Sequence, residues 1–277
     1  MGPLDLIAAV PAAPQMKMPE TAQALFTIWL GLPLAVMLYI AIQKIRSGEG
    51  PLMLYCIIGG AFASLWEATV NLLGTMIYAE DGIWTAYTMY DRKIPVLIPL
   101  AYSWFVGGQA YIIFRLFQRG VTRRRVFEIW GVLFLINIVI ETPGLLANVY
   151  KYYGNQPWDI WGFPFWYGWA NPLAPIIAAA TIYKLWPHIQ RGIARLAVIP
   201  IVFMSFGIGY AAISLPLWWT LNDTGFGYGV TYLASLVTLG LALFVLWVVS
   251  IAVAKPERPR PAETEAAEPA RREPVAV

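Results

Sequence analysis

Two glutamates lie inside long apolar stretches of this chain, where water should be scarce. Glu67 occurs in "LWEATVN" and Glu141 in "ETPG". Asn71 follows Glu67 by four residues and Asn137 precedes Glu141 by four, and residues four apart share one face of a helix. We therefore expect each helix to present a carboxyl and an amide on the same side.

Carboxyls in such positions can transfer protons. A charge at the centre of a bilayer costs about 2.5–3.5 kcal/mol on insertion scales, and intramembrane acids commonly mark functional sites. Burial disfavours the ionised form, so a glutamate in a water-poor cavity can hold a proton and donate it. Two such groups that approach one another can act as an acid–base pair. The alternative is structural: these glutamates and asparagines only hydrogen-bond neighbouring helices.

The composition of the chain indicates a membrane protein. Of its 277 residues, 59% are hydrophobic and 13% are charged, whereas soluble proteins carry about 25% charged residues. Apolar stretches of about 20 residues can cross a bilayer as helices. We identify seven of them: residues 24–43, 52–78, 94–115, 127–149, 162–185, 197–219 and 227–253. We therefore predict an all-α, polytopic bundle of seven transmembrane helices, integral to the cell membrane.

The distribution of basic residues predicts the orientation of this bundle. One side carries Lys44, Arg46, Arg115, Arg119, Arg123, Arg124, Arg125, Lys184, Arg191, Arg195 and the basic residues of the tail. The other side carries only Lys17, Arg92, Lys93 and Lys151. The positive-inside rule then places the N-terminus outside and the C-terminus in the cytoplasm. The run "VTRRRV" is a topology signal in this interpretation, and no nucleic-acid partner is expected.

Three regions follow from these spans. Residues 24–254 form the transmembrane domain, and residues 1–23 form a short external segment. Residues 255–277 are rich in Pro, Ala, Glu and Arg and have little to bury, so we predict a disordered cytoplasmic tail.

The pattern E-x10-Y-x5-W occurs twice, in residues 67–84 and 141–158, with an offset of 74 residues. Each block runs from a glutamate in a span, through an aromatic outer loop, to a returning span. The pattern predicts a parallel repeat of helix pairs. At about 1.5 Å per helical residue, both carboxyls would lie roughly 16 Å below the tyrosine of their block, at a similar depth.

Several chemistries lose their usual signals. Cys56 is the only cysteine and His188 the only histidine, so we expect no disulfide, no metal site and no cofactor held by such ligands. The chain has no P-loop, no dinucleotide-binding glycine motif and no nucleophile elbow. The last span contains no lysine for a retinal Schiff base.

Aromatic residues are concentrated on the outer side. Most should form an interfacial belt, but the aromatics of "WDIWGFPFWYGW" are too dense for one helix face. Some should point into the bundle, where their rings can stabilise a cation. The candidate substrate-binding residues are Trp66, Asn71, Tyr78, Trp84, Gln109, Asn137, Tyr152, Trp158, Trp166, Asn171 and Trp218.

A third acid, Asp223, lies in "NDTGFGYG" before the last span. It can serve as a turn or N-cap residue, or as a carboxyl at the mouth of the cavity. The candidate catalytic residues are thus Glu67, Glu141 and Asp223.

The size, the seven spans, "LWEATVN" and Asp223 together resemble the integral membrane terpene cyclases of meroterpenoid pathways. The resemblance implies a small, all-helical membrane enzyme that protonates an epoxide or alkene of a prenyl chain without a metal, with Glu67 and Asp223 as acids. Glu141 lies outside that pattern. "VLIPLAYSW" and "GFPFWYGW" are similar to segments of membrane proteins of carotenoid biosynthesis, which also act on isoprenoid lipids.

Our first hypothesis is therefore an enzyme that takes a lipid-soluble isoprenoid from the bilayer and cyclises or hydrates it. Glu67 would donate the proton, Asn71 would orient it, and Glu141 would act as counter-base or second acid. The alternatives are a proton-coupled small-molecule transporter and a non-enzymatic seven-span sensor or assembly protein. The sequence leaves the oligomeric state open.

Overall fold

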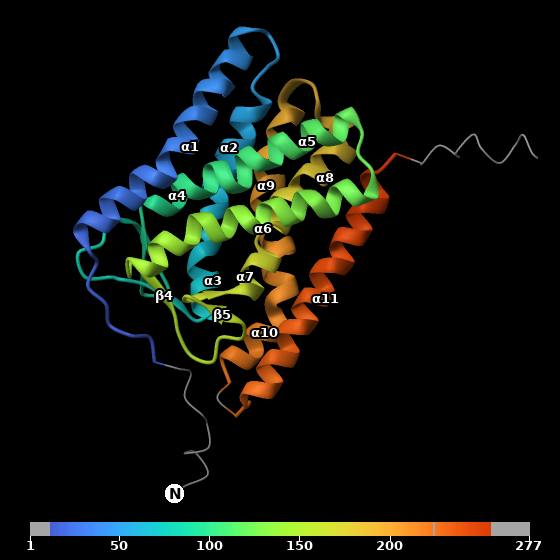
Figure 1. Ribbon diagram of the computed structural model, residues 1–277. Coiled ribbons are helices and arrows are strands. Elements are labelled where there is room, and N and C mark those ends of the chain that lie inside the picture. Colours follow the sequence, from blue (N-terminus) through green and yellow to red (C-terminus); the bar gives the residue numbers. More distant parts are fainter. Residues whose placement is uncertain (1–11, 224, 256–277) are drawn as a thin grey trace, which may run out of the picture.

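The computed structural model describes residues 12–223 and 225–255. Helices dominate this part of the chain (Figure 1). In the first half they are α1 (Glu20–Arg46), α2 (Leu52–Ala63), a 3-10 turn (Ser64–Trp66), α3 (Glu67–Leu73), α4 (Leu97–Tyr102), a π-helical segment (Ser103–Gly108), α5 (Gln109–Arg119) and α6 (Arg123–Leu146). In the second half they are α7 (Phe165–Ala170), α8 (Leu173–Ile189), a 3-10 helix (Gly192–Ala197), α9 (Val198–Phe206), a π-helical segment (Gly207–Ala211), α10 (Ala212–Leu221) and α11 (Tyr228–Val253).

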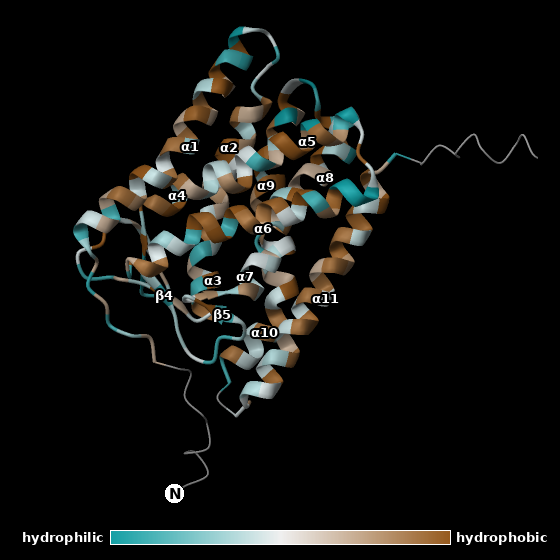
Figure 2. Cartoon of the chain, in the orientation of Figure 1, coloured by the Kyte–Doolittle hydropathy of each residue, from teal (hydrophilic) through white to brown (hydrophobic). Residues whose placement is uncertain are grey.

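Six continuous helical segments are long and apolar enough to cross a membrane. They are Glu20–Arg46, Leu52–Leu73, Leu97–Arg119, Arg123–Leu146, Gly192–Leu221 and Tyr228–Val253. Much of their length is coloured as hydrophobic in Figure 2. These six helices indicate a multi-pass membrane protein. The predicted span 162–185 instead falls on α7 and α8, which are separated by a turn at Asn171 and Pro172.

The described part of the chain is mostly helical, as predicted, but it is not all-helical, because short strands form three antiparallel pairs. Strand β1 (Met76–Tyr78) pairs with β4 (Tyr150–Tyr152), β2 (Thr85–Met89) with β3 (Arg92–Pro95), and β5 (Asp159–Ile160) with β6 (Phe163–Pro164). Two predicted spans, 52–78 and 127–149, were too long. Their helices end at Leu73 and Leu146, and Thr75 and Asn148 then take φ angles of 49° and 56°, a left-handed conformation that ends a helix.

The two blocks of the sequence pattern contain the same order of elements. Residues 52–119 run from a helix through a strand and a hairpin to a returning helix, and residues 123–189 do the same. The equivalent strands β1 and β4 pair with each other. Glu67 is the first residue of α3, and Glu141 lies in the last two turns of α6.

The basic connections lie together, away from the strands. In Figure 1 the turns α1–α2, α5–α6 and α8–α9 lie at one end of the bundle, and the strands and the α10–α11 turn lie toward the other. Of the predicted terminal regions, α1 begins at Glu20, inside the expected external segment. Residues 1–11 and 256–277, which include nearly all of the predicted tail, lie outside the described residues.

Two glycines allow α2 to approach the π-helical segment closely. A Cβ on Gly60 would lie 2.5 Å from the carbonyl oxygen of Tyr102, and a Cβ on Gly107 would lie 2.1 Å from that of Cys56. Small residues at such crossings let helix backbones pack together in membranes. Tyr102 is thereby fixed on the helix that follows the β2–β3 hairpin.

This close packing predicts that Gly107→Ala is destabilising. The added methyl group meets backbone atoms that cannot rotate away, so we expect a loss of about 1–3 kcal/mol or more in unfolding free energy. Gly131→Ala is the matched control, because a Cβ there has no atom within 4 Å and alanine favours helix by about 1 kcal/mol. Thermal unfolding of the purified variants in detergent measures both, and equal melting temperatures would contradict the proposed packing.

Candidate functional site

Glu67 and Glu141 line the same cavity. Its wall includes Phe26 from α1, Leu97 from α4 and Asn171 from the turn between α7 and α8. The cavity volume is about 40 Å³, which is room for a few water molecules, since one needs about 10–15 Å³ on this measure. Two glutamates 74 residues apart in the sequence therefore face one small, mostly apolar space.

Tyrosine hydroxyls hold Glu67. The side chain is 4% exposed. The hydroxyl of Tyr78 donates to Glu67 Oε1 at 2.5 Å, and the hydroxyl of Tyr102 donates to Glu67 Oε2 at 2.5 Å. Asn71, with its amide in the orientation that satisfies both polar atoms, donates to Glu67 Oε1 at 3.1 Å. The expected pairing of Glu67 with Asn71 on one helix face is confirmed.

Glu141 has a similar set of partners. The hydroxyl of Tyr150 donates to Glu141 Oε2 and also lies 2.9 Å from the Glu141 carbonyl oxygen. The hydroxyl of Tyr167 donates to Glu141 Oε1 at 3.2 Å. Each glutamate thus accepts one hydroxyl from the strand that follows it and one from the helix after the next hairpin. The longer bond makes Glu141 Oε1 the carboxyl oxygen that is least firmly held.

The β1–β4 sheet joins the two glutamate sites. Tyr78 and Tyr150 are directly opposite each other in the strand register, and their ring centroids lie 5.5 Å apart. Burial and then the adjacent Glu67 raise the pKa of Tyr78 well above its usual value, and burial and Glu141 do the same for the pKa of Tyr150. Both hydroxyls therefore keep their protons and act as donors.

A chain of polar groups runs from Tyr167, which donates to Glu141, to the backbone of α6. The Asn171 amide nitrogen lies 3.2 Å from the Tyr167 hydroxyl and 2.7 Å from Asn137 Oδ1, and the Asn137 amide nitrogen donates to the Leu133 carbonyl at 3.2 Å. In the described part of the chain, the hydrogen bonds of Asn137 thus go to Leu133 and Asn171 rather than to Glu141. Tyrosines occupy both carboxyl oxygens, and Asn137 instead ties α6 to the turn before α8.

Two of the predicted residues, Trp166 and Tyr152, contact residues of the site but do not line the cavity. The indole nitrogen of Trp166 donates to Gln156 Oε1 at 2.9 Å, and Gln156 in turn donates to Thr75 Oγ1 at 2.7 Å. The Tyr152 ring packs against that of Tyr167, with centroids 5.8 Å apart. These contacts fix the start of β1 and the position of Tyr167.

Three predicted tryptophans lie elsewhere. Trp66 donates to the carbonyl oxygen of Phe203 at 3.2 Å. Trp158 donates to Ser235 Oγ at 2.8 Å, and Trp84 is 50% exposed. None of the three is among the described residues that line the cavity. Their positions fit helix packing and an aromatic outer rim better than substrate contact.

Gln109 and Trp218 are also outside the cavity. Gln109 lines a separate groove between α5 and α6. Trp218 is 2% exposed, beside the ring of Tyr210 at a centroid distance of 5.7 Å. Within the described residues, the Trp218 indole nitrogen and the Tyr210 hydroxyl make no hydrogen bond.

Asp223 belongs to the turn after α10. Its Oδ1 accepts a hydrogen bond from the Gly225 amide at 2.9 Å, and its carbonyl accepts one from the Phe226 amide at 3.3 Å. Asp223 is not one of the described residues around the cavity. The structure therefore brings Glu67 together with Glu141, and not with the second acid that the resemblance implies.

Sequence reasoning missed the tyrosine partners Tyr102, Tyr150 and Tyr167. Tyr102 and Tyr167 occur in "VLIPLAYSW" and "GFPFWYGW", but neither of them nor Tyr150 is among the candidate residues. A usable signal was present: each glutamate span is followed by a tyrosine within eleven residues, and each returning helix carries another near its start. A buried carboxyl requires donors, and a tyrosine hydroxyl supplies one from a largely apolar side chain.

The arrangement places two carboxyls, each held by tyrosine hydroxyls, at one small and mostly apolar cavity, as proton exchange between them would require. Among the described residues, no group of three His, Cys, Asp or Glu side chains could hold a metal ion.

The chain matches no known protein-family model, no curated protein and no solved structure. The geometry of the cavity is therefore the main basis for inferring function.

The hydrogen bonds to Glu67 predict a contrast between two buried tyrosines. Tyr102→Phe leaves Glu67 Oε2 without its donor and should lower the unfolding free energy by about 1–3 kcal/mol. Tyr210→Phe removes a hydroxyl that has no protein partner among the described residues, and should be neutral or stabilising. Both are measured as melting temperatures in detergent. A loss for Tyr210→Phe as large as that for Tyr102→Phe would show that hydrogen bonding to Glu67 is not what distinguishes them.

Proposed function

We propose that this protein is a membrane-embedded enzyme that protonates an alkene or epoxide of an isoprenoid lipid and guides cyclisation or hydration of the carbocation. The observation that carries the proposal is the shared cavity of Glu67 and Glu141, in which both carboxyls contact tyrosine hydroxyls. The resemblance to membrane terpene cyclases supports the same chemistry, with Glu141 in place of Asp223 as the second acid.

The proposed reaction begins with proton transfer from Glu67. The proton goes to an epoxide oxygen, whose C–O bond then breaks, or to an alkene carbon, whose π electrons form the new C–H bond. A neighbouring alkene attacks the cationic carbon and closes a ring. The reaction ends when Glu141 removes a proton from the last cation, or when water adds and loses one. A proton shared between the two carboxyls restores the starting state.

The apolar and aromatic wall suits a carbocation. The rings of Tyr78, Tyr150 and Phe26 lie at the cavity, and Phe26 stacks on Tyr150 with a centroid distance of 6.3 Å. A desolvated cation gains about 2 kcal/mol or more from such a π face. Exclusion of bulk water also delays quenching of the cation.

A prenyl chain requires the cavity to expand. Ligand pockets usually measure about 300–1,000 Å³, against about 40 Å³ here. Helix α1 supplies Phe26 and Leu30 to the wall, and its opposite face is exposed at Leu25, Trp29 and Leu32. We infer that the substrate enters from the bilayer by displacing α1 from α4.

The proposal includes the finer membrane arrangement. We place seven spans in the cell membrane, with α7 and α8 together forming the fifth, the N-terminus outside and the C-terminus in the cytoplasm. The support is the concentration of basic residues at the end of the bundle that carries the α1–α2, α5–α6 and α8–α9 turns. The common element order of residues 52–119 and 123–189 supports a parallel repeat of helix pairs.

One observation favours a second function, a proton-coupled small-molecule transporter. The present cavity is large enough for water and protons but not for a prenyl chain, and intramembrane carboxyl pairs serve as proton relays. Proton-gradient-dependent uptake of a solute by proteoliposomes, without turnover of any prenyl substrate, would identify a transporter. Function retained after replacement of both glutamates by glutamine would instead fit a sensor or assembly protein.

Glu67→Gln and Glu141→Gln test the proposed enzyme directly. Purified protein is given a farnesylated phenol or its terminal epoxide in D2O, and products are identified by mass spectrometry. We expect product from the wild type, with one solvent deuterium on carbon when an alkene is protonated, and a fall in kcat of at least about 100-fold in either variant. Glu49→Gln on the exposed α1–α2 turn is the control. Unchanged turnover in Glu67→Gln would remove Glu67 from the reaction.

Asp223→Asn tests the role of the third acid. The asparagine side-chain oxygen can still accept the Gly225 amide, so we expect kcat within about threefold of wild type and a change in unfolding free energy within about 0.5 kcal/mol, as at ordinary surface positions. A fall in kcat as large as that of Glu67→Gln, with the fold retained, would show that Asp223 takes part in the chemistry. The same assay in D2O and a melting curve supply both readouts.

A further inference from the structure

A groove separates α5 from α6 on the outside of the bundle. Its walls are apolar, with Ile112 and Leu116 from α5 and Val132 and Ile136 from α6, and its volume is about 160 Å³. Ile112 and Val132 are 40% and 56% exposed. The groove is distinct from the cavity of Glu67 and Glu141, and the two share no lining residue.

The length of the groove matches one leaflet of a bilayer. On α6 the lining runs from Arg125 to Ile136, which at about 1.5 Å per residue is roughly 16 Å. The hydrocarbon core of a bilayer is about 30 Å thick, so the groove spans about half of it. On α5 the lining runs from Leu116 near the turn to Gln109 farther into the membrane.

The end of the groove near the α5–α6 turn is strongly basic. Arg115, Arg119, Arg123, Arg124 and Arg125 lie within eleven residues and are all exposed. Lys255 joins them from the end of α11, because its backbone amide donates to the Val121 carbonyl at 3.1 Å. Glu128 is the only acidic residue from 109 to 136, so this end keeps a net positive charge.

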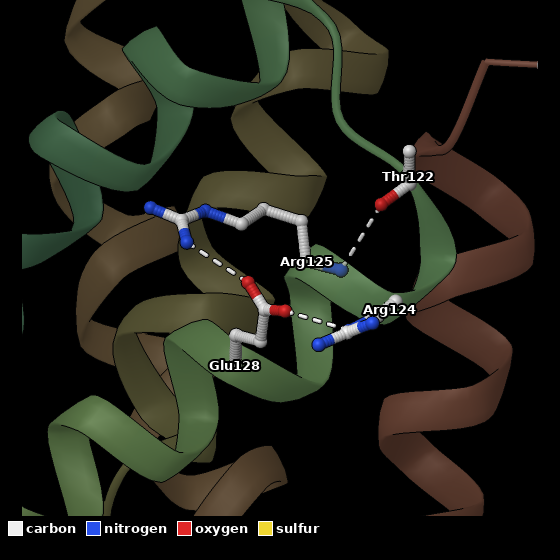
Figure 3. Close-up of polar contacts among 4 residues, drawn as sticks. All are labelled: Thr122, Arg124, Arg125 and Glu128. Carbon is white, nitrogen blue, oxygen red and sulfur yellow. Dashed lines mark hydrogen bonds and ion pairs between the residues drawn. The ribbon is translucent and has the colours of Figure 1, made fainter.

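Glu128 orients two of the arginines. Arg124 Nε lies 2.9 Å from Glu128 Oε1, and Arg125 Nη1 lies 2.9 Å from Glu128 Oε2 (Figure 3). The Thr122 hydroxyl accepts the Arg125 backbone amide at 3.2 Å and so fixes the start of α6. Glu128 and Arg125 line the groove, and the same carboxylate holds the guanidinium group of Arg124 beside them. Planar guanidinium groups bind phosphate oxygens well.

We propose that this groove binds an anionic phospholipid of the cytoplasmic leaflet. One acyl chain lies between α5 and α6, and the phosphate contacts the guanidinium groups of Arg124 and Arg125. Charge complementarity and the match to one leaflet select this occupant, because a zwitterionic lipid gains less from the basic end and a free anion gains nothing from the apolar walls. The site does not depend on the proposed enzymatic function, and its assignment to the cytoplasmic leaflet rests on the orientation proposed above.

The test measures lipid binding to the full-length protein in detergent. Phosphatidylglycerol and phosphatidylcholine with identical acyl chains are added separately, and bound lipid is counted by native mass spectrometry alongside the melting temperature. We expect tighter binding and a larger rise in melting temperature with phosphatidylglycerol. Since each basic residue near an anionic surface changes binding roughly fivefold, the double variant Arg124→Gln with Arg125→Gln should bind it at least about tenfold more weakly.

Two further variants keep the proposal falsifiable if the double variant folds poorly. Glu128→Gln releases both arginines and removes a negative charge, so phosphatidylglycerol should bind more tightly. Val132→Trp fills the groove, so both lipids should bind less. The matched control, Lys184→Gln with Arg191→Gln, removes two positive charges near the α8–α9 turn and should retain the preference for phosphatidylglycerol.

Several outcomes would overturn the proposal. Equal binding of the two lipids, or an equal loss in the α8–α9 control, would show that the arginine cluster has no special role. Weaker binding in Glu128→Gln would mean that the ion pairs only support the fold. A rise in melting temperature with inorganic phosphate as large as that with phosphatidylglycerol would make this an anion site without a lipid.

Discussion

The pairing of β1 with β4 is the interaction on which the candidate site depends. The two glutamates belong to helices of different blocks, and the antiparallel register places Tyr78 opposite Tyr150 between them. Side chains alternate along a strand, and the burial of β1 and β4 follows this alternation, with Ile77 and Lys151 on the less buried face. A slip of one residue would turn both hydroxyls away from their carboxyls. The register of these three residue pairs therefore sets one hydroxyl partner for each acid.

Strands this short need support, because isolated two-stranded ribbons are marginally stable. Arg92 supplies part of it by donating to the Met76 carbonyl at 2.7 Å and to the Tyr153 hydroxyl at 2.9 Å. Gln156 supplies more through Thr75. Gln23 joins α1 to the β1–β2 loop, accepting the Trp84 amide at 2.7 Å. These contacts tie an aromatic outer layer to the helix that lines one side of the cavity.

The helices, the two acids and Tyr78 could be predicted from the sequence, whereas Tyr102, Tyr150 and Tyr167 were missed. Apolar length marks a membrane helix because lipid leaves backbone groups no other partner, and the predicted spans lie on helices within a few residues at most ends. The two spans that were predicted too long show the limit of this reasoning. Their helices end near Gly74, Thr75 and Asn148, and hydropathy alone does not separate the residues of a helix from the residues that follow it. Tyr150 and Tyr167 were not among the candidate site residues, because an aromatic ring near the membrane surface serves a belt or a buried site equally well. Only the tertiary contacts distinguish these roles.

The partners of the two glutamates are neutral hydroxyls, so neither carboxyl belongs to a structural ion pair. A buried carboxylate held by arginine or lysine would be fixed in its charged form, since an adjacent positive charge strongly favours ionisation. In the described part of the chain, the cavity is lined by no arginine, lysine or histidine. Glu67 and Glu141 meet tyrosine hydroxyls instead, which are neutral and can donate to a carboxylate or rotate to accept from a carboxylic acid. Either protonation state is therefore compatible with the same hydrogen-bonded framework. That freedom is what a group must have if it is to release a proton and later recover one.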